Sequence, residues 1–186
     1  MAQLSLPFFK NSPKQEVNTG HIVIDLVRNF NDLDAAFQLR RQAFVKGKNI
    51  PEEMEFDGND FTSSHLLLRV DGNAAGTLRI RYFKDLAKME RLCVDSRFRG
   101  QGLPKYMLDY TEDYLAHKGY TYFFSYILKE LKTYWLARGF ELQDNAQEVH
   151  EANLTLLPVI YPFKKVVAHH KNSIDLLAKE GFAKTY

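Results

Sequence analysis

The sequence predicts an α+β fold of three layers, in which a mixed, twisted sheet is flanked by helices. Three observations support this prediction. The chain has 186 residues, 45% of them hydrophobic, which is enough to bury one substantial core. Strand-like runs alternate with segments of helical spacing along the chain. Over residues 89–127 a strand, a helix and a second strand follow one another, and such a crossover implies a parallel strand pair.

Runs of apolar, β-branched and aromatic residues mark the strands. The first is His21 to Val27, with the sequence HIVIDLV. Asp71-Gly72-Asn73 separates two later runs and predicts a hairpin, because Asp-Gly supplies the positive φ that tight hairpin turns need. The expected strands are residues 21–27, 65–70, 75–82, 89–94, 121–127, 140–142 and 153–161.

Caps and spacing identify the helices. Asn31 or Asp32 is placed to cap a helix that ends near Phe44. Residues 50–61 are acidic and predict a loop or a short second helix. A glycine then follows each of the next two helical segments, as is typical of helix ends. These later helices are expected at residues 103–117 and 129–137, and a last one at residues 165–179.

Composition narrows the classes of function. The net charge of +2 is the small difference between 25 basic and 23 acidic side chains, which gives no reason to expect a nucleic-acid partner. Cys93 is the sole cysteine, so an internal disulfide and a cysteine zinc cluster are excluded, and we expect no metal. No apolar run is long enough to cross a membrane, and the amino-terminal segment lacks the apolar core of a secretory signal. We therefore expect a cytoplasmic protein without a membrane partner.

Three segments are expected along the chain. Residues 1–20 form an N-terminal arm, residues 21–161 form the domain that carries the site, and residues 162–186 form a helical extension packed on or near it. The apolar side chains of the extension either cover the core or pair with a second copy in a homodimer. The sequence leaves both possibilities open.

The stretch Arg97 to Gly102, with the sequence R-F-R-G-Q-G, lies between an expected strand and an expected helix. The first turn of a helix has N–H groups without intrahelical partners, so it stabilises phosphate oxygens. Gly100 lets the backbone approach a ligand closely. A dinucleotide loop would need a third glycine where Lys105 stands, and the nucleotide P-loop sequence is absent. The pattern that remains is R-x-x-G-x-G.

This pattern resembles the coenzyme A loop of the GCN5-related N-acetyltransferase (GNAT) superfamily, and residues 134–140 (YWLARGF) resemble a second segment of that family. The stretch 39–45 (LRRQAFV) is similar to the ElaA-like bacterial acetyltransferases within it. The resemblance implies the GNAT acyl-CoA N-acyltransferase fold. It also implies acetyl-CoA or another acyl-CoA as co-substrate, and an amine on a small molecule or a protein as acceptor. The amine would attack the thioester directly.

Two other functions remain open. Arg40, Phe44, Glu55 and Asp57 also resemble positions of acyl-homoserine-lactone synthases, which share the fold and use longer acyl chains. Those synthases usually lack the complete glycine loop, so we rank them second. The third possibility is a module that binds acyl-CoA as a sensor or assembly subunit without turnover.

The resemblance also implies which residues bind the donor. The strand residues Leu92, Cys93 and Val94 would offer backbone groups to the pantetheine arm. Backbone groups of the loop and the first helical turn would hold the pyrophosphate, with charge added by two arginines. These loop residues are Arg97, Arg99, Gly100, Gln101, Gly102, Leu103, Pro104 and Lys105.

Two residues are candidates for catalysis. Glu90 is expected on the same strand face as Leu92 and Val94, where a family base acts through water; the alternative is an ordinary ion-paired carboxylate. Trp135 stands where the family has a tyrosine that protonates the leaving thiolate, and indole cannot supply that proton. Tyr134 carries a phenol one residue away, about 100° around the helix. Trp135 is otherwise explained as core packing.

An acidic cluster and the cysteine complete the candidates. The cluster lies on the expected acceptor side, so it either attracts a cationic amine or forms a solvated loop. Cys93 has apolar neighbours, which predict a small buried side chain rather than a nucleophile. The acidic cluster comprises Glu52, Glu53, Glu55, Asp57 and Asp60.

Overall fold

The computed structural model describes residues 20–144 and 147–164. The expected arm before residue 20 and the expected helix over residues 165–179 lie outside the described residues. The domain boundaries proposed at these two places therefore stay predictions. In the described part of the chain, no helix has the length and apolar character needed to cross a membrane.

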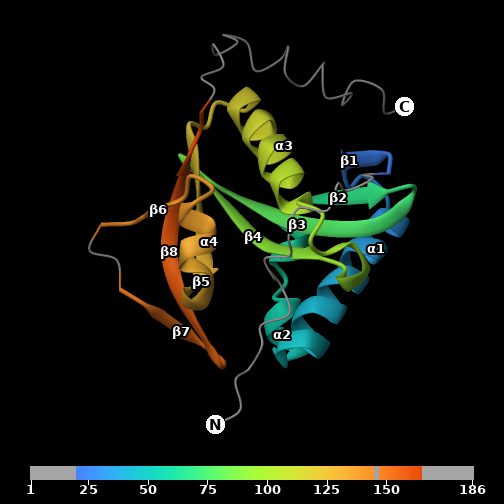
Figure 1. The fold of residues 1–186 in the computed structure, drawn as a ribbon, viewed down its shortest axis with the longest axis horizontal. Helices are drawn as coiled ribbons and strands as arrows, with labels where there is room; N and C mark the ends of the chain where they lie inside the picture. Colours follow the sequence, from blue (N-terminus) through green and yellow to red (C-terminus); the bar gives the residue numbers. More distant parts are fainter. Residues whose placement is uncertain (1–19, 145–146, 165–186) are drawn as a thin grey trace.

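A single mixed sheet organises the described residues (Figure 1). Its strand order is β1-β2-β3-β4-β5-β8-β6, and β7 pairs with β8 beside this path. Only the β4–β5 pair is parallel, as the strand–helix–strand order predicted; the other pairs described are antiparallel. The strands are β1 Ile22–Leu26, β2 Ser64–Val70, β3 Asn73–Phe83, β4 Leu86–Val94, β5 Tyr122–Leu128, β6 Glu141–Leu142, β7 Val149–Glu151 and β8 Leu154–Pro162.

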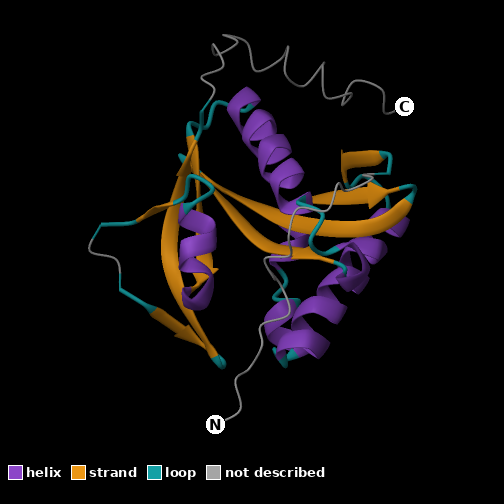
Figure 2. Ribbon diagram, in the orientation of Figure 1, coloured by secondary structure: helices purple, strands orange, loops and turns teal. Residues whose placement is uncertain are grey.

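Helices cover both faces of the sheet (Figure 2). One face packs against the apolar side of α3, and the other packs against α1. Two core clusters record this division, because neighbouring residues of β2 alternate between them: Leu66 and Leu68 belong to the α3 cluster and Leu67 to the α1 cluster. The helices are α1 Phe30–Arg40, α2 Glu52–Glu55, α3 Leu103–His117 and α4 Lys132–Leu136.

Most elements agree with the sequence prediction. The hairpin turns at residues 71–72, and α3 has the predicted bounds. The first helix begins earlier than expected, because the Asn29 side chain rather than Asn31 or Asp32 caps it; Asn29 Oδ1 accepts from the Asp32 N–H at 2.9 Å. That helix continues as a π-helical turn over Arg41–Lys46. Strand β7 was not predicted, because its three residues are exposed and carry no apolar alternation.

The parallel pair at the centre of the sheet is short. Strands β4 and β5 are in register only over Ala87–Met89 and Phe123–Ser125. The Ser125 hydroxyl donates to the Met89 carbonyl at 2.9 Å, at the last paired position. Beyond it the two strands separate, and the gap faces the start of α3. This separation creates room for a site inside an otherwise continuous sheet.

Candidate active site

A cavity of about 560 Å³ lies where β4 and β5 separate. The glycine loop and the first residues of α3 line one end. The region of α2 and the β7–β8 hairpin line the other, where Ile50, Met54 and Leu154 contribute apolar surface. The cavity therefore joins the predicted phosphate loop to the opposite face of the sheet, and we call its two ends the loop end and the α2 end.

The glycine loop has the geometry that the sequence predicted. Gly100 has φ of 81° and Gly102 has φ of 72°, conformations that side chains disfavour. A Cβ placed on either glycine would meet no atom within 4 Å, so the space beside them is open. Gly102 is the N-cap of α3 and offers no side-chain cap, which leaves first-turn N–H groups available to an anion.

Not every predicted loop residue lines the cavity. Arg99, Gly100, Gly102, Leu103 and Pro104 do line it. The Lys105 N–H donates to the Gly102 carbonyl at 2.9 Å, so this donor is already engaged.

Three side chains of the loop region point elsewhere or are engaged. Arg97 is exposed and pairs with Asp95 at 2.9 Å, and Lys105 pairs with Asp109 at 2.5 Å on the exposed face of α3. Gln101 is not among the cavity-lining residues.

A bulge in β4 overturns one expectation about Glu90. Arg79 pairs with Glu90 and Thr77 with Cys93, so β4 holds one residue more than β3 between these positions. Arg91 lies at this bulge with φ of 55°, which is uncommon for a residue with a side chain. Alternation therefore shifts: Leu92 and Val94 pack with the α3 cluster, whereas Cys93 packs with the α1 cluster. Glu90 shares the face of Cys93, and the predicted shared face with Leu92 and Val94 is wrong.

The α2 end is built on a buried ion network whose first centre is Arg40. The Arg40 side chain is fully buried at the end of α1. Its Nε donates to Glu55 Oε1 at 2.6 Å, its Nη2 to the Glu55 carbonyl at 2.7 Å, and its Nη1 to Asp60 Oδ1 at 2.6 Å. Such a charge is tolerated in the interior because it is paired and hydrogen-bonded.

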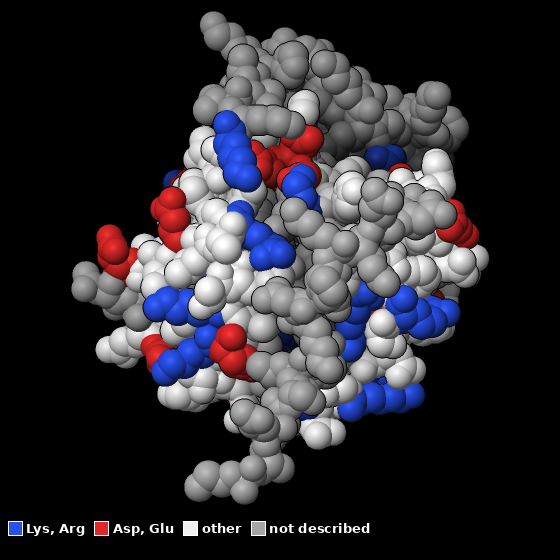
Figure 3. Space-filling view, in the orientation of Figure 1, with Lys and Arg blue, Asp and Glu red and all other residues white. Residues whose placement is uncertain are grey.

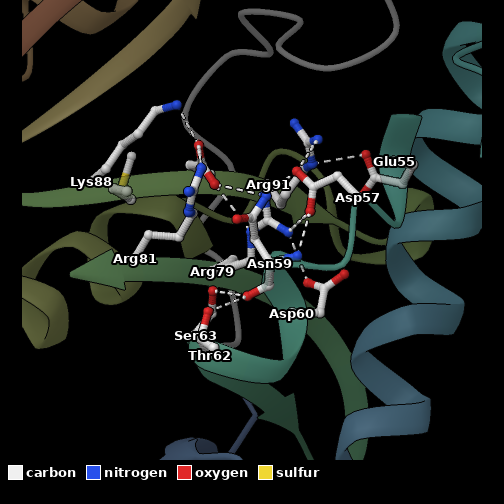
Figure 4. Close-up of polar contacts among 12 residues, drawn as sticks. Glu55, Asp57, Asn59, Asp60, Thr62, Ser63, Arg79, Arg81, Lys88 and Arg91 are labelled. Carbon is white, nitrogen blue, oxygen red and sulfur yellow. Dashed lines mark hydrogen bonds and ion pairs between the residues drawn. The ribbon is translucent and has the colours of Figure 1, made fainter. Parts of the chain in front are cut away.

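The second centre of the network is Arg79, in the middle of β3 (Figure 4). Its side chain is also fully buried, and its Nη1 donates to Asp57 at 2.8 Å and to Asp60 at 2.9 Å. Its Nη2 donates to Glu90 Oε2 at 2.7 Å. Burial would raise the pKa values of Asp57 and Asp60, but hydrogen bonds and charge, from Arg79 at Asp57 and from Arg40 and Arg79 at Asp60, hold both below their usual range.

Glu90 faces cations on several sides. Besides Arg79, Lys88 pairs with it, and Arg81 Nη1 lies 3.8 Å from Glu90 Oε1. Burial would raise the pKa of Glu90, yet hydrogen bonding and charge from Lys88, together with the charge of Arg79, lower it. Glu90 is therefore ionised at neutral pH, and it lines the cavity with Lys88 and Arg81.

The acidic cluster has a use that neither sequence-based alternative described. Glu55 and Asp60 are the counter-charges of buried arginines, and Glu52 pairs with Arg41 at 2.7 Å. Of the five carboxylates, only Asp57 lines the cavity. The cluster is thus neither a simple solvated loop nor an open acidic patch. The residues that explain the acidic cluster are Arg40 and Arg79. Both are distant from the cluster in the sequence, so the ion pairs could not be predicted from local spacing.

The aromatic pair on α4 divides into a core residue and a cavity residue. Trp135 is 6% exposed and packs in the α3 cluster, its ring 5.0 Å from that of Phe140. Tyr134 lines the cavity, and the Arg138 guanidinium lies 3.3 Å from its ring centroid. Burial raises the pKa of the Tyr134 phenol against the charge of Arg138, so the phenol keeps its proton at neutral pH.

Cys93 is 3% exposed, and its burial raises the pKa of its thiol. A thiol that stays protonated is a poor nucleophile. The interpretation of Cys93 as a buried apolar side chain is therefore confirmed, and the residue is also among those that line the cavity.

Figure 3 shows charged side chains of both signs among the described residues of the face that it draws. Lysine and arginine side chains are interspersed there with aspartate and glutamate. The cations that bear on the site are instead those lining the cavity: Lys48, Arg81, Lys88, Arg91, Arg99 and Arg138.

The chain is similar to proteins of one known family. The family model described as "Acetyltransferase (GNAT) family" matches residues 33–137. Among curated proteins, the uncharacterised YyaT of Bacillus subtilis is 32% identical over 93 residues, which are 48% of this chain and 63% of YyaT. The chain thus spans less than two thirds of that relative.

Solved structures show the same fold. Escherichia coli ElaA superposes with a TM-score of 0.67 at 19% identity, over 76% of this chain and 99% of ElaA. An acyl-CoA N-acyltransferase from Pseudomonas aeruginosa gives a TM-score of 0.66 at 20% identity, over 76% and 99% of the two chains. With the family model covering more than half of its residues, the chain belongs to the GNAT acetyltransferase family.

Proposed function

We propose that this protein is an N-acyltransferase that moves an acetyl group from acetyl-CoA to a primary amine. The observation that carries the proposal is the open glycine loop at one end of a cavity that continues between β4 and β5. Family membership implies an acyl-CoA co-substrate. The loop offers that co-substrate backbone donors at a helix N-terminus, and the separated strands offer its arm unpaired backbone groups.

The donor would lie along a defined path. The N–H groups of residues 100–103 would hold the pyrophosphate, because Pro104 has no N–H and that of Lys105 is engaged. Arg99 would add charge at this end. The pantetheine arm would run between Leu92–Val94 and the unpaired end of β5, which places the thioester between Glu90 and Tyr134.

The chemistry would proceed by direct attack. The amine nitrogen forms a bond to the thioester carbonyl carbon, and the carbon–sulfur bond then breaks to release the coenzyme A thiolate. The amine gives its proton to solvent through a water held by Glu90, and the thiolate takes a proton either from water or from Tyr134, whose phenolate then regains a proton from solvent. Glu90 is a weak base because its pKa is lowered, so we assign it to holding water and the amine rather than to strong proton abstraction.

Release of free coenzyme A from acetyl-CoA in the presence of a panel of amines tests the proposal. Amine-dependent release above the rate of hydrolysis is expected. Acetyl-CoA binding without release for any amine would instead support the non-catalytic module.

Substitution of the two candidate catalytic residues tests their roles. Tyr134→Phe should lower kcat about a hundredfold, since a general acid contributes on that order. Glu90→Gln should lower kcat less, because Glu90 holds water and the amine rather than abstracting a proton. Both variants should keep their affinity for acetyl-CoA, measured by calorimetry. Unchanged kcat in both would remove these residues from the mechanism.

The apolar lining of the α2 end supports a second candidate, transfer of a longer acyl chain. Phe44, Ile50, Met54 and Leu156 line the cavity there and could bury methylene groups. Comparing acetyl-CoA with hexanoyl-CoA and decanoyl-CoA under identical conditions separates the two candidates. A kcat/KM that rises with chain length would demote acetyl transfer.

A further inference from the structure

The charges of the buried network balance in its interior but not where it meets the cavity. Arg40, Arg79 and Arg91 are matched by Glu55, Asp57 and Asp60, to which their ion pairs connect them. His65 lies against Asp60, and its pKa is lowered by burial, so it adds no charge at neutral pH. At the cavity, two cations, Arg81 and Lys88, lie beside the single carboxylate of Glu90, which leaves one positive charge in excess.

Arg81 and Lys88 are placed where two cations repel each other. They are direct cross-strand partners in the β3–β4 register, so their side chains leave the sheet side by side on one face. Like charges directly opposite each other destabilise a strand pair. Their side chains are only 27% and 20% exposed, so solvent screens this repulsion incompletely.

An aromatic ring lies beside each of the two cations. The Arg81 guanidinium lies 5.2 Å from the centroid of Phe83, and the Lys88 ammonium lies 5.0 Å from that of Tyr126. Both cations line the cavity, and Figure 4 shows their side chains together on the side of Arg79 away from Glu55. They form an oriented pair of donors with one carboxylate between them, an arrangement suited to an anion.

The rest of the α2 end does not cancel this excess. Among the described residues, the carboxylates lining the whole cavity are Asp57, Glu90 and Glu151, of which Asp57 is held by Arg79. An acceptor that was simply a cationic amine would approach a wall that is already positive.

We propose that the acceptor is a compact amine that also carries a carboxylate or phosphate a few bonds from its nitrogen, with the acid group bound by Arg81 and Lys88 and the amine beside Glu90. This rests on the proposed acyl transfer and names its substrate class. Such a molecule places its negative group against the two cations and its amine against the carboxylate of Glu90. Its acid group would also relieve the repulsion between the two cations.

Matched pairs of acceptors test the proposal. Each of several amino acids is compared with its amide, and phosphoethanolamine with ethanolamine, in the acetyl-CoA assay. Acids should be preferred over their neutral partners by about tenfold or more in kcat/KM, as for a half-buried charge pair. The two arms distinguish carboxylate from phosphate as the recognised group.

Variants show whether the preference comes from these two cations. Arg81→Gln and Lys88→Gln should each reduce the ratio of acid to neutral acceptor toward one. Lys84→Gln removes the same charge from a side chain that is 93% exposed and does not line the cavity, and it should leave the ratio unchanged. A preference that survives both cavity variants would overturn the assignment.

Calorimetric binding of the same amines to the protein saturated with coenzyme A keeps the test independent of turnover. Acids that bind without any coenzyme A release in the assay would support the acceptor class and contradict the proposed transfer. Neutral amines acetylated as well as their acids would support the transfer and overturn the acceptor class. Failure of every acid to bind would also overturn it.

Discussion

At the loop end of the cavity the site is made of backbone, whereas at the α2 end it is made of charged side chains. The loop end needs only two glycines with positive φ and the start of α3, all within a few residues of one another. The α2 end assembles side chains from α1, α2, β3 and β4 around two buried arginines. The difference teaches that the loop end, proposed to bind the donor, depends on a few neighbouring residues, while the α2 end, proposed to bind the acceptor, depends on contacts between distant parts of the chain.

The largest effect is expected from breaking the side-chain end. Arg40→Met removes one of the two cations that pair with each of Glu55 and Asp60, inside the buried network, and should lower the free energy of unfolding by about 3–5 kcal/mol. The adjacent Arg41→Met is the control, because its ion pair with Glu52 is exposed and contributes about 0–1 kcal/mol. Urea denaturation measures both. Equal losses would show that the buried network has no special weight.

The next largest effect is expected at the loop end, where a glycine substitution should reduce the affinity for coenzyme A. A second glycine substitution, with a similar effect on stability but outside the cavity, is its control. Gly100→Val forces a branched side chain into positive φ and fills the open space beside the loop, so affinity for coenzyme A should fall about a hundredfold. Gly72→Val carries the same backbone strain, of about 1–3 kcal/mol, in a hairpin turn that does not line the cavity.

Calorimetry with coenzyme A and thermal unfolding separate these two effects. The two glycine variants should unfold at similar temperatures, and only Gly100→Val should lose binding. Equal affinity in both would remove the donor from this loop.

The smallest effect concerns pH and belongs to the side-chain end. Burial lowers the pKa of His65, so below its unfolded pKa of about 6.5 the unfolded chain takes up a proton that the folded protein resists. Stability should therefore fall as the pH drops from 7 to 5, and His65→Asn should flatten that slope.

A second loss should follow below pH 4. The pKa values of Asp57 and Asp60 are lowered in the folded protein, so their stabilisation is present above their unfolded pKa and is lost as pH falls toward the folded values. Urea unfolding at pH 7, 5 and 3.5 measures both steps. If wild type and His65→Asn both lost stability in one and the same step, the assignment of the first loss to His65 and of the second to Asp57 and Asp60 would be contradicted.

This contrast also explains what the sequence could reveal. The bounds of α3, the hairpin and the parallel pair follow from local patterns, and so does the glycine loop. The bulge at Arg91 was hidden, because one extra residue in a strand carries no composition signal and yet reverses which face Glu90 occupies. The role of the acidic cluster was hidden for a similar reason: Arg79 is 22 residues away from Asp57 in the chain.

Trp135 marks the limit of arguing from a motif position. The family pattern raised the question of a missing proton donor there, and the structure places the indole in the core and the neighbouring Tyr134 on the cavity wall. Whether the phenol acts is a matter for the kinetics of Tyr134→Phe.

A structure with acetyl-CoA bound tests the division between the two ends most directly. The account predicts the pyrophosphate on the backbone of residues 100–103, the thioester between Glu90 and Tyr134, and Arg81 and Lys88 left uncovered for the acceptor. Donor phosphates lying on Arg81 and Lys88 instead would contradict it, because the cations would then belong to coenzyme A and not to the acceptor.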